Sequence, residues 1–273
     1  MKYVVDSNRL RDEALAKFLQ STPKNVAVLT DYAAMEALKG DAVIGMFESM
    51  KVLAHFPSQV QVLKTTMVVC SISGSSKGLQ RRLVDVPRTK EFGIFCRSLA
   101  RAHSGNTPLA SRLHKLGTEA RAHMARGEAD ARGFASSSVE VARIFSQEER
   151  RQILAPGPLS PELHQKLVRQ VMHLSAVVFD LHPAVRRLPS QKELINTYIF
   201  RSSLCHLLLG FEYASFGGVE GKAPARIRND IVDSHFATYA TFYDGVLSGD
   251  ELTNRLYVVT TRVLDRFRIA YLQ

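Results

Sequence analysis

The stretch Lys2-Tyr3-Val4-Val5-Asp6-Ser7-Asn8 is a short apolar run that ends at a carboxylate. Tyr and Val favour β-strands, so the run predicts a buried strand over Tyr3–Val5 that ends at Asp6. Ligand-binding side chains of α/β proteins gather in the crevice beyond the carboxyl ends of parallel strands. Asp6 is therefore the first candidate residue for a functional site.

The segments that follow this strand alternate between strand and helix patterns. A helix is expected over Arg9–Gln20, and a second buried strand over Val26–Leu29 leads into a helix that Thr30 or Asp31 caps. Strand, helix, strand and helix in this order predict a parallel pair of strands. Further strands are expected at Val60–Leu63, Met67–Ser71 and Gly245–Ser248, with a long amphipathic helix from Glu251. The fold class is α/β.

The middle of the chain reads as helical. The clearest helix pattern covers Ser160–Leu181, where apolar residues recur every three or four positions. Gly127–Ser138 is small and polar, which favours a mobile connection between helices. The expected domains are residues 1–72 and 225–273, which form one α/β domain, and residues 73–224, which form a helical insertion.

The composition restricts the partners. The 273 residues carry 36 Lys and Arg against 26 Asp and Glu, a net charge of +10. Such a balance supplies the sequence-independent part of nucleic-acid binding, although a solvated helical surface explains any single basic cluster equally simply. Three cysteines without a C-x-x-C pair indicate neither a disulfide framework nor a zinc module. No apolar run approaches the length of a membrane span, and we expect a cytoplasmic protein.

Acidic residues stand at the places where a metal crevice would form. The set is Asp6 after the first strand, Glu36 on the helix after the second, Asp230 and Asp233 on a helix expected over about 228–243, and Asp250 after the last strand. A spacing of three residues puts Asp230 and Asp233 about 60° apart around their helix, so that both can face one crevice. Carboxylates are the ligands that Mg²⁺ and Mn²⁺ prefer. Glu212 and Glu220 are weaker candidates on the approach to this helix.

In four places the chain resembles the PIN-domain family of metal-dependent ribonucleases. The matching segments are Val4-Val-Asp6-Ser7-Asn8, Leu29-Thr-Asp-Tyr-Ala-Ala-Met-Glu36, Asp233-Ser-His-Phe-Ala-Thr-Tyr-Ala240 and Val246-Leu-Ser-Gly-Asp250. They occur in the family's order, and the resemblance extends over about 110 residues, while the middle of the chain is much larger than the family's usual helical connection. The resemblance implies a PIN-like three-layer α/β/α fold with a mostly parallel central sheet and a large helical insertion.

The same resemblance implies hydrolysis of a phosphodiester in nucleic acid, RNA rather than DNA, with Mg²⁺ or Mn²⁺ as cofactor. The implied metal ligands are Asp6, Glu36, Asp233 and Asp250, with Asp230 as an alternative to Asp233. Ser7, Asn8 and Ser248 would orient these ligands. Arg226 and Arg228, near the positive N-terminal end of the acidic helix, would contact a phosphate. A toxin or an antiviral defence effector is the expected biological role, with a regulatory protein or a second copy of the chain as further partners.

Besides a purely structural α-helical protein, two other readings of the sequence stay open. One is a structure-specific DNA nuclease of the same architecture, since the choice of RNA rests on analogy alone. The other is a non-catalytic protein that binds nucleic acid or acts as a scaffold, in which the basic helical insertion carries the function. The metal-dependent nuclease is the reading that the four acidic segments favour.

Overall fold

The structure, a computed structural model, describes residues 1–215, 219 and 221–271, and the side chains of residues 1–215, 219 and 221–267. It divides into two compact units. The sheet unit comprises Met1–Thr66, Leu83–Gly127 and Tyr243–Asp250, and the helical unit comprises Met67–Arg82, Glu128–Phe242 and Glu251–Gln273. This division differs from the expected segments 1–72, 73–224 and 225–273, because most of the last 49 residues join the helical unit and part of the expected insertion joins the sheet unit.

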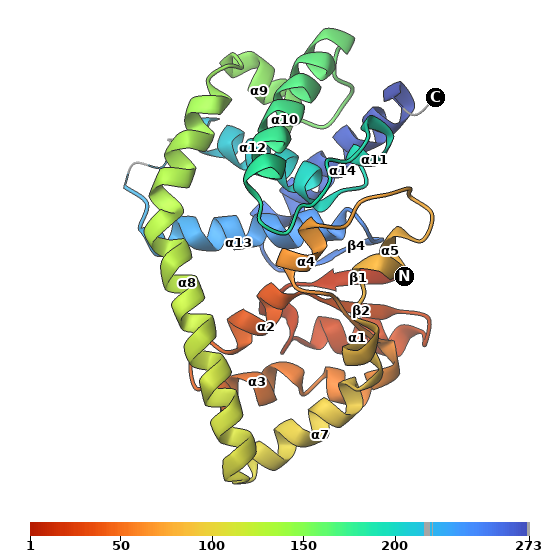
Figure 1. Cartoon of the computed structure of the whole chain (residues 1–273), viewed down its shortest axis with the longest axis vertical. Helices are drawn as coiled ribbons and strands as arrows, with labels where there is room; N and C mark the ends of the chain where they lie inside the picture. The colour runs from red at the N-terminus through yellow and green to blue at the C-terminus, as the bar shows by residue number, and fades with distance from the viewer. Residues whose placement is uncertain (216–218, 220, 272–273) are drawn as a thin grey trace. The chain divides into compact units, whose positions relative to one another are not determined.

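Four described strands form one parallel sheet in the sheet unit (Figure 1). They are β1 (Lys2–Val5), β2 (Val26–Leu29), β3 (Val60–Val62) and β4 (Gly245–Leu247), in the spatial order β3-β2-β1-β4. All three neighbouring pairs are parallel, and β1 pairs with β2 on one side and β4 on the other. This arrangement confirms the α/β class and brings the carboxyl ends of all four strands to one edge of the sheet.

The sheet is covered on both faces, as parallel sheets usually are. Val4 and Val5 point to opposite faces, and neither side chain is exposed. On the face of Tyr3, helix α1 packs against the sheet, with the rings of Tyr3 and Phe18 stacked 5.0 Å apart. The helices of this unit are α1 (Glu13–Ser21), α2 (Asp31–Ala37), α3 (Ala42–Met50), α6 (Val86–Lys90), α7 (Phe92–His103) and the first part of α8 (Thr107–Ala142).

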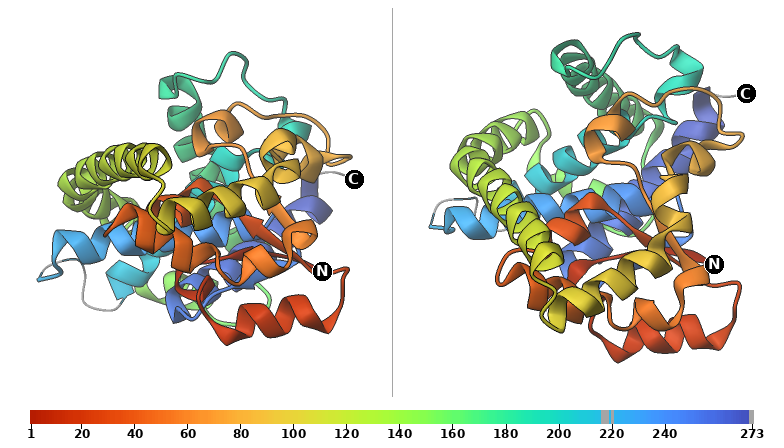
Figure 2. Two further views of the ribbon diagram at one scale, coloured as in Figure 1. Left: turned by 90° about the horizontal axis from the view of Figure 1, so that it is seen from below. Right: turned by 60° about the horizontal axis from the view of Figure 1, so that its bottom comes forward.

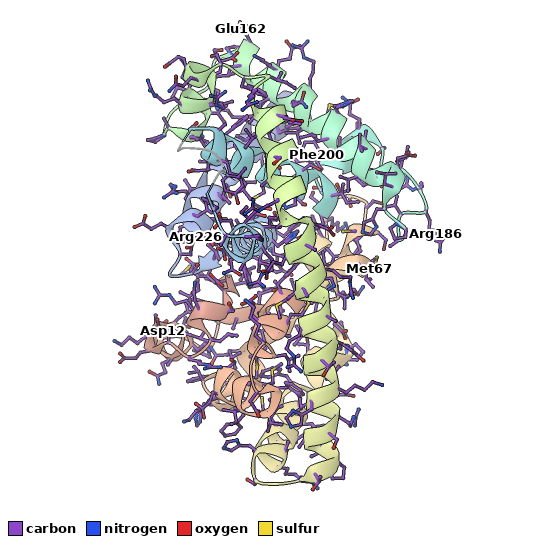
Figure 3. The ribbon with its side chains drawn as sticks, turned by 90° about the vertical axis from the view of Figure 1, so that its left-hand side faces the viewer. Asp12, Met67, Glu162, Arg186, Phe200 and Arg226 are labelled. Carbon is purple, nitrogen blue, oxygen red and sulfur yellow. The ribbon has the colours of Figure 1, made fainter. Side chains whose placement is uncertain are left out.

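The helical unit is built around α12. Its elements are α4 (Thr66–Cys70), α5 (Leu79–Leu83), the rest of α8, α9 (Gln147–Leu154), α10 (Pro161–Leu181), α11 (Gln191–Leu194), α12 (Tyr198–Ser215), α13 (Pro224–Ala240) and α14 (Glu251–Tyr271). Helix α12 is buried on nearly every side and contacts α9, α10, α13 and α14, as expected of a helix that is apolar all round. The side chain of Phe200 lies in this core (Figure 3).

Several elements appear where the sequence predicts them. The four strands lie within a residue or two of the expected ranges, and α10 covers Pro161–Leu181 with Ser160 as its N-cap. Thr30 rather than Asp31 caps α2, since its hydroxyl accepts a hydrogen bond from the Ala33 N–H. The last helix begins at Glu251, as expected. In the described residues no helix is both long enough and apolar enough to cross a membrane.

Two predicted segments are wrong. Met67–Ser71 was expected as a strand, but Thr66–Cys70 is helix α4, in which the adjacent Val69 and Cys70 are buried while Met67 and Val68 are exposed. Two neighbouring buried residues suit a helix, whereas a half-buried strand alternates. Residues Gly127–Ser138 do not form a connection but lie inside α8, where Ala131 and Ala135 are buried one turn apart. These two alanines pack in the core of the helical unit.

Two expected helices differ in their bounds, and the helical middle of the chain has a break between α8 and α9. The one over Arg9–Gln20 divides into a 3-10 turn at Ser7–Arg9 and α1, whose N-cap Asp12 accepts a hydrogen bond from the Ala14 N–H. The chain between Ala142 and Gln147 leaves the helical conformation because Ser146 and Glu149 form a capping box that starts α9. Helix α13 begins at Pro224, earlier than expected, since proline is favoured in the first turn of a helix.

A pair of glycine substitutions tests the packing of the helical unit. A methyl group on Gly210 of α12 would lie 2.5 Å from the Ser138 carbonyl oxygen, whereas one on Gly133 of α8 would meet nothing within 4 Å. We expect Gly210→Ala to destabilise the protein by about 1–3 kcal/mol through overpacking. Gly133→Ala, the matched control, should stabilise it by about 0.5–1 kcal/mol, because alanine is the better helix former. Thermal unfolding followed by circular dichroism measures both, and equal effects would contradict the packing.

Candidate functional site

Asp6 is a buried carboxylate at the carboxyl end of β1. Its side chain is 1% exposed, and three neutral side chains donate hydrogen bonds to it. Ser248 Oγ lies 2.5 Å and Asn8 Nδ2 2.8 Å from Asp6 Oδ2, and Ser7 Oγ lies 3.3 Å from Asp6 Oδ1. Ser7 and Asn8 lie in the turn after β1, and Ser248 directly follows β4, so the Asp6 carboxylate is held between these two segments.

The loop after β4 is held against the same group. The Gly249 N–H donates to Asn8 Oδ1 at 3.1 Å, and the Asp250 N–H donates to Ser248 Oγ at 3.0 Å. One hydroxyl therefore donates to Asp6 and accepts from the backbone of Asp250, which links the two predicted acids through two hydrogen bonds. Asp250 itself is partly exposed. The structure thus brings together Asp6, Ser7, Asn8, Ser248 and the backbone of Asp250 at the carboxyl edge of the sheet.

The electrostatics of Asp6 are unusual for a carboxylate. Burial raises the pKa of Asp6 above its ordinary value, and the hydrogen bonds from Ser248, Asn8 and Ser7 only partly oppose the shift. Buried charges in proteins are usually paired with an opposite charge or with a metal ion, but all the hydrogen-bond partners of this carboxylate in the described residues are neutral. A bound cation would therefore stabilise the ionised form of this carboxylate.

The raised pKa gives a stability prediction with a definite sign. A carboxyl group whose folded-state pKa lies above its unfolded value stabilises the fold at low pH, and that stability is lost as the pH rises through the folded-state pKa. Without divalent cations, Asp6→Asn should therefore raise the melting temperature at pH 7, and the difference from the parent protein should shrink as the pH falls toward 4. Thermal unfolding in chelator at both pH values checks this expectation. A variant that is less stable at pH 7 would contradict it.

Glu36 lies on α2 in the same unit but has a different partner. Its carboxylate forms an ion pair with Lys39, three residues later, and its side chain is 17% exposed. None of the interactions described for Glu36 joins it to Asp6 or Asp250, so its role as a metal ligand stays a prediction. Lys39 engages only one of the two carboxylate oxygens, Oε2.

Asp230 and Asp233 belong to the helical unit, where α13 carries them. Asp230 is buried, and its Oδ2 accepts hydrogen bonds from Tyr213 Oη at 2.9 Å and Lys222 Nζ at 3.1 Å. Burial and the charges of Asp230 and Asp233 raise the pKa of Tyr213. Asp230 therefore has a structural ion pair, while Asp233 is partly exposed.

The two arginines before these acids differ in their surroundings. Arg228 forms an ion pair with Glu128 at 3.0 Å and is 17% exposed. Arg226 is exposed in the first turn of α13 (Figure 3), and its side chain has no hydrogen-bond partner in the described part of the chain. Only Arg226 is thus available to a phosphate without breaking an ion pair. Of the two weaker acidic candidates, Glu212 pairs with Arg255, and Glu220 lies outside the described residues.

The sequence analysis did not select Asp31 as a site residue. Asp31 follows β2 by two positions at the same sheet edge, and its carboxylate accepts hydrogen bonds from the Thr66 N–H at 2.7 Å and the Thr66 hydroxyl at 2.8 Å. Burial raises the pKa of Asp31. Its place just after a parallel strand was the available signal, but the neighbouring Thr30 made a capping role the simpler interpretation.

The donor set at the sheet edge is small. Among the described residues, no group of three or more His, Cys, Asp or Glu side chains is arranged to hold a metal ion. Mg²⁺ is commonly bound by one or two carboxylates, with water and substrate phosphate as the other ligands, and the buried carboxylate of Asp6 lies at this edge of the sheet. Comparisons of the chain with protein-family models, with curated proteins and with solved structures find no match.

Proposed function

We propose that the protein is a metal-dependent nuclease that hydrolyses phosphodiester bonds in RNA, on a PIN-like three-layer fold with an added helical unit. The observation that carries the proposal is the buried carboxylate of Asp6, which receives three hydrogen bonds from neutral side chains at the carboxyl edge of a parallel sheet. Keeping such a group ionised costs free energy unless a cation binds it. Perturbed acids of this kind cluster at functional sites.

The residues at the sheet edge have separate roles in this proposal. Asp6 and Asp250 would hold Mg²⁺ or Mn²⁺, with Asp233 and Glu36 as further acids that the resemblance implies. A divalent ion bound there would activate water and offset the charge that develops on the phosphate. Ser248, Asn8 and Ser7 fix the Asp6 carboxylate, and preset ligands need less reorganisation when the ion and the substrate arrive.

The charge of the chain supports a polyanionic substrate. A net charge of +10 attracts nucleic acid in a salt-dependent and sequence-independent way. Arg226, exposed in the first turn of α13 and without a hydrogen-bond partner in the described part of the chain, is a suitable phosphate contact. These features suit RNA and DNA alike, and RNA is favoured by the resemblance alone.

A substrate panel tests the proposal. Labelled single-stranded RNA, transfer RNA and branched DNA are incubated with the purified chain in Mn²⁺, in Mg²⁺ and in chelator. We expect cleavage of an RNA substrate that requires the divalent ion. Cleavage of branched DNA alone would replace RNA with DNA as the substrate. Binding of nucleic acid without cleavage of any substrate would contradict the proposal and favour the non-catalytic binding protein.

A further inference from the structure

An apolar groove runs between α7 and the first part of α8 in the sheet unit. The two helices are joined by a short turn, and both can be followed in Figures 1 and 2. The groove encloses about 250 Å³ and is lined by six apolar side chains, together with Glu91, Ser98 and Arg112. The six are Ile94, Phe95, Leu99, Leu109, Leu113 and Leu116. None of them has a role in the proposed nuclease site.

The groove has a buried floor and exposed walls. Leu99 and Leu113 form the floor and are 3% and 7% exposed, whereas Ile94, Phe95 and Leu116 are 56%, 38% and 49% exposed. On α8, positions 109, 113 and 116 share one helix face, which is turned to the apolar face of α7. Exposed apolar side chains that rim a groove mark a contact surface for another molecule, and two adjacent helix faces suit a third helix.

The surroundings of the groove are strongly basic. Residues 86–126 contain eight Lys or Arg and two Glu, a net charge of +6 out of +10 for the whole chain. All eight are exposed: Arg88, Lys90, Arg97, Arg101, Arg112, Lys115, Arg121 and Arg126. Arg88 pairs with Asp85, and none of the other seven forms an ion pair in the described residues. Arg112 lines the groove beside Glu91, and Lys90 and Arg97 line a neighbouring hollow, so the positive charge at this face complements an acidic partner.

A second hollow extends the basic surface on the other side of Ile94. It encloses about 370 Å³, and Lys90 and Arg97 contribute to its lining with Pro57, Ser58, Thr89 and Gly93. Carboxylates that flank an apolar stripe could reach these two cations. Surfaces that bind single-stranded nucleic acid place aromatic rings among the basic residues for base stacking, but the walls here are mainly aliphatic. The chemistry therefore favours a protein helix over RNA.

We propose that this groove binds an acidic amphipathic helix of a partner protein, with apolar residues of the helix against Ile94, Phe95 and Leu116 and its carboxylates against the surrounding basic residues. The inference does not depend on the nuclease proposal, because the residues that line the groove and the hollow include none of the proposed metal ligands or their hydrogen-bond partners.

The test uses the full chain and four labelled probes in fluorescence anisotropy. The first is a synthetic 18-residue peptide with leucines at helical i, i+3, i+4 and i+7 spacing and glutamates elsewhere. The second replaces its glutamates with lysines, the third scrambles the order of the first, and the fourth is a single-stranded RNA. We expect the first to bind as a helix in the groove, with a Kd on the order of 10 μM. The second and third should bind at least about tenfold more weakly.

Two variant pairs separate the apolar and the charged contributions. Ile94→Ser with Leu116→Ser should weaken binding of the acidic peptide at least about tenfold. Because both side chains are about half exposed, the substitutions should leave folding intact, which thermal unfolding checks. Leu181→Ser, at a 75% exposed leucine of α10, is the matched control and should have no effect. Arg97→Glu with Arg112→Glu should weaken the peptide similarly, whereas Arg186→Glu, at the exposed arginine that points away from the ribbon in Figure 3, should not.

Three results would overturn the proposal. The first is an acidic peptide that does not bind at 100 μM or binds no better than its scrambled form. The second is binding that the Ile94 and Leu116 substitutions leave unchanged, since the groove would then contribute nothing. The third is RNA that binds more tightly than the peptide, with a binding that only the charge-reversal variants abolish. This result would identify the face as a surface for nucleic acid.

Discussion

Asp6→Asn should lower metal-dependent cleavage of RNA by at least about a hundredfold. Partners that only orient a metal ligand cost about 10- to 100-fold when they are removed, and Asp6 is proposed as a ligand itself. The variant should fold, because the Asn oxygen can still accept from Ser248 and Asn8, and its amide can donate to the Ser7 hydroxyl. The measurement is the initial rate of cleavage under saturating Mn²⁺, with folding checked by circular dichroism.

The control for this prediction is Asp180→Asn, the same chemical change at an exposed residue of α10. It should leave the rate within about twofold, the size of effect that surface substitutions usually have. RNA affinity of Asp6→Asn should also be retained, because the exposed basic residues are untouched. Full activity of the Asp6 variant, or an equal loss in the Asp180 variant, would remove Asp6 from the site.

Ser248→Ala should lower the cleavage rate by about 10- to 100-fold. The substitution removes the hydroxyl that donates to Asp6 Oδ2 at 2.5 Å and accepts from the Asp250 N–H at 3.0 Å. Both acids then lose a shared hydrogen-bond partner, so the Asp6 carboxylate is less well fixed. The effect should appear as a higher Mn²⁺ concentration for half-maximal activity and a lower maximal rate, measured in a metal titration.

Ser248→Thr separates this role from simple packing. Threonine retains the hydroxyl and should recover most of the activity, while Ser111→Ala, at an exposed serine of α8, should change nothing. If alanine and threonine at position 248 lower the rate equally, the size of the side chain and not its hydroxyl would be the cause. The positioning role of Ser248 would then be lost.

Much of the sheet unit could be predicted because its signals are local. Short runs such as Val26–Leu29 combine strand propensity with uniform apolarity, which is typical of a strand buried on both faces. The helix α10 follows from a regular apolar period. Tertiary packing overrides local signals elsewhere, and it explains why Thr66–Cys70 is helical and why the small residues of 127–138 lie in a helix.

The candidate site was predictable only in part. The hydrogen bond between Asp6 and Ser248 joins residues 242 positions apart, and no period or propensity reveals such a contact. Their position after parallel strands, together with the resemblance to a known family, was the useful signal. The Lys39 partner of Glu36 and the Lys222 partner of Asp230 were missed, because either acid reads equally well as a metal ligand or as one member of an ion pair.

The groove between α7 and α8 was also missed. Its basic residues contribute to the net charge, which indicated a polyanion, but the arrangement of charge around exposed Ile94, Phe95 and Leu116 depends on how two helices pack. Along the chain, several helical turns and a connecting segment separate Ile94 from Leu116. The structure therefore adds a second class of partner to the one that composition suggests.

The most direct measurement is X-ray diffraction from crystals soaked in Mn²⁺, with anomalous data collected near the manganese absorption edge. The proposal predicts an anomalous peak about 2.0–2.6 Å from a carboxylate oxygen of Asp6, with Asp250 as a second ligand directly or through water. The Asp6→Asn crystal, soaked in the same way, should lack the peak. Manganese bound at other sites in the crystal, with none beside Asp6, would contradict the metal-dependent nuclease.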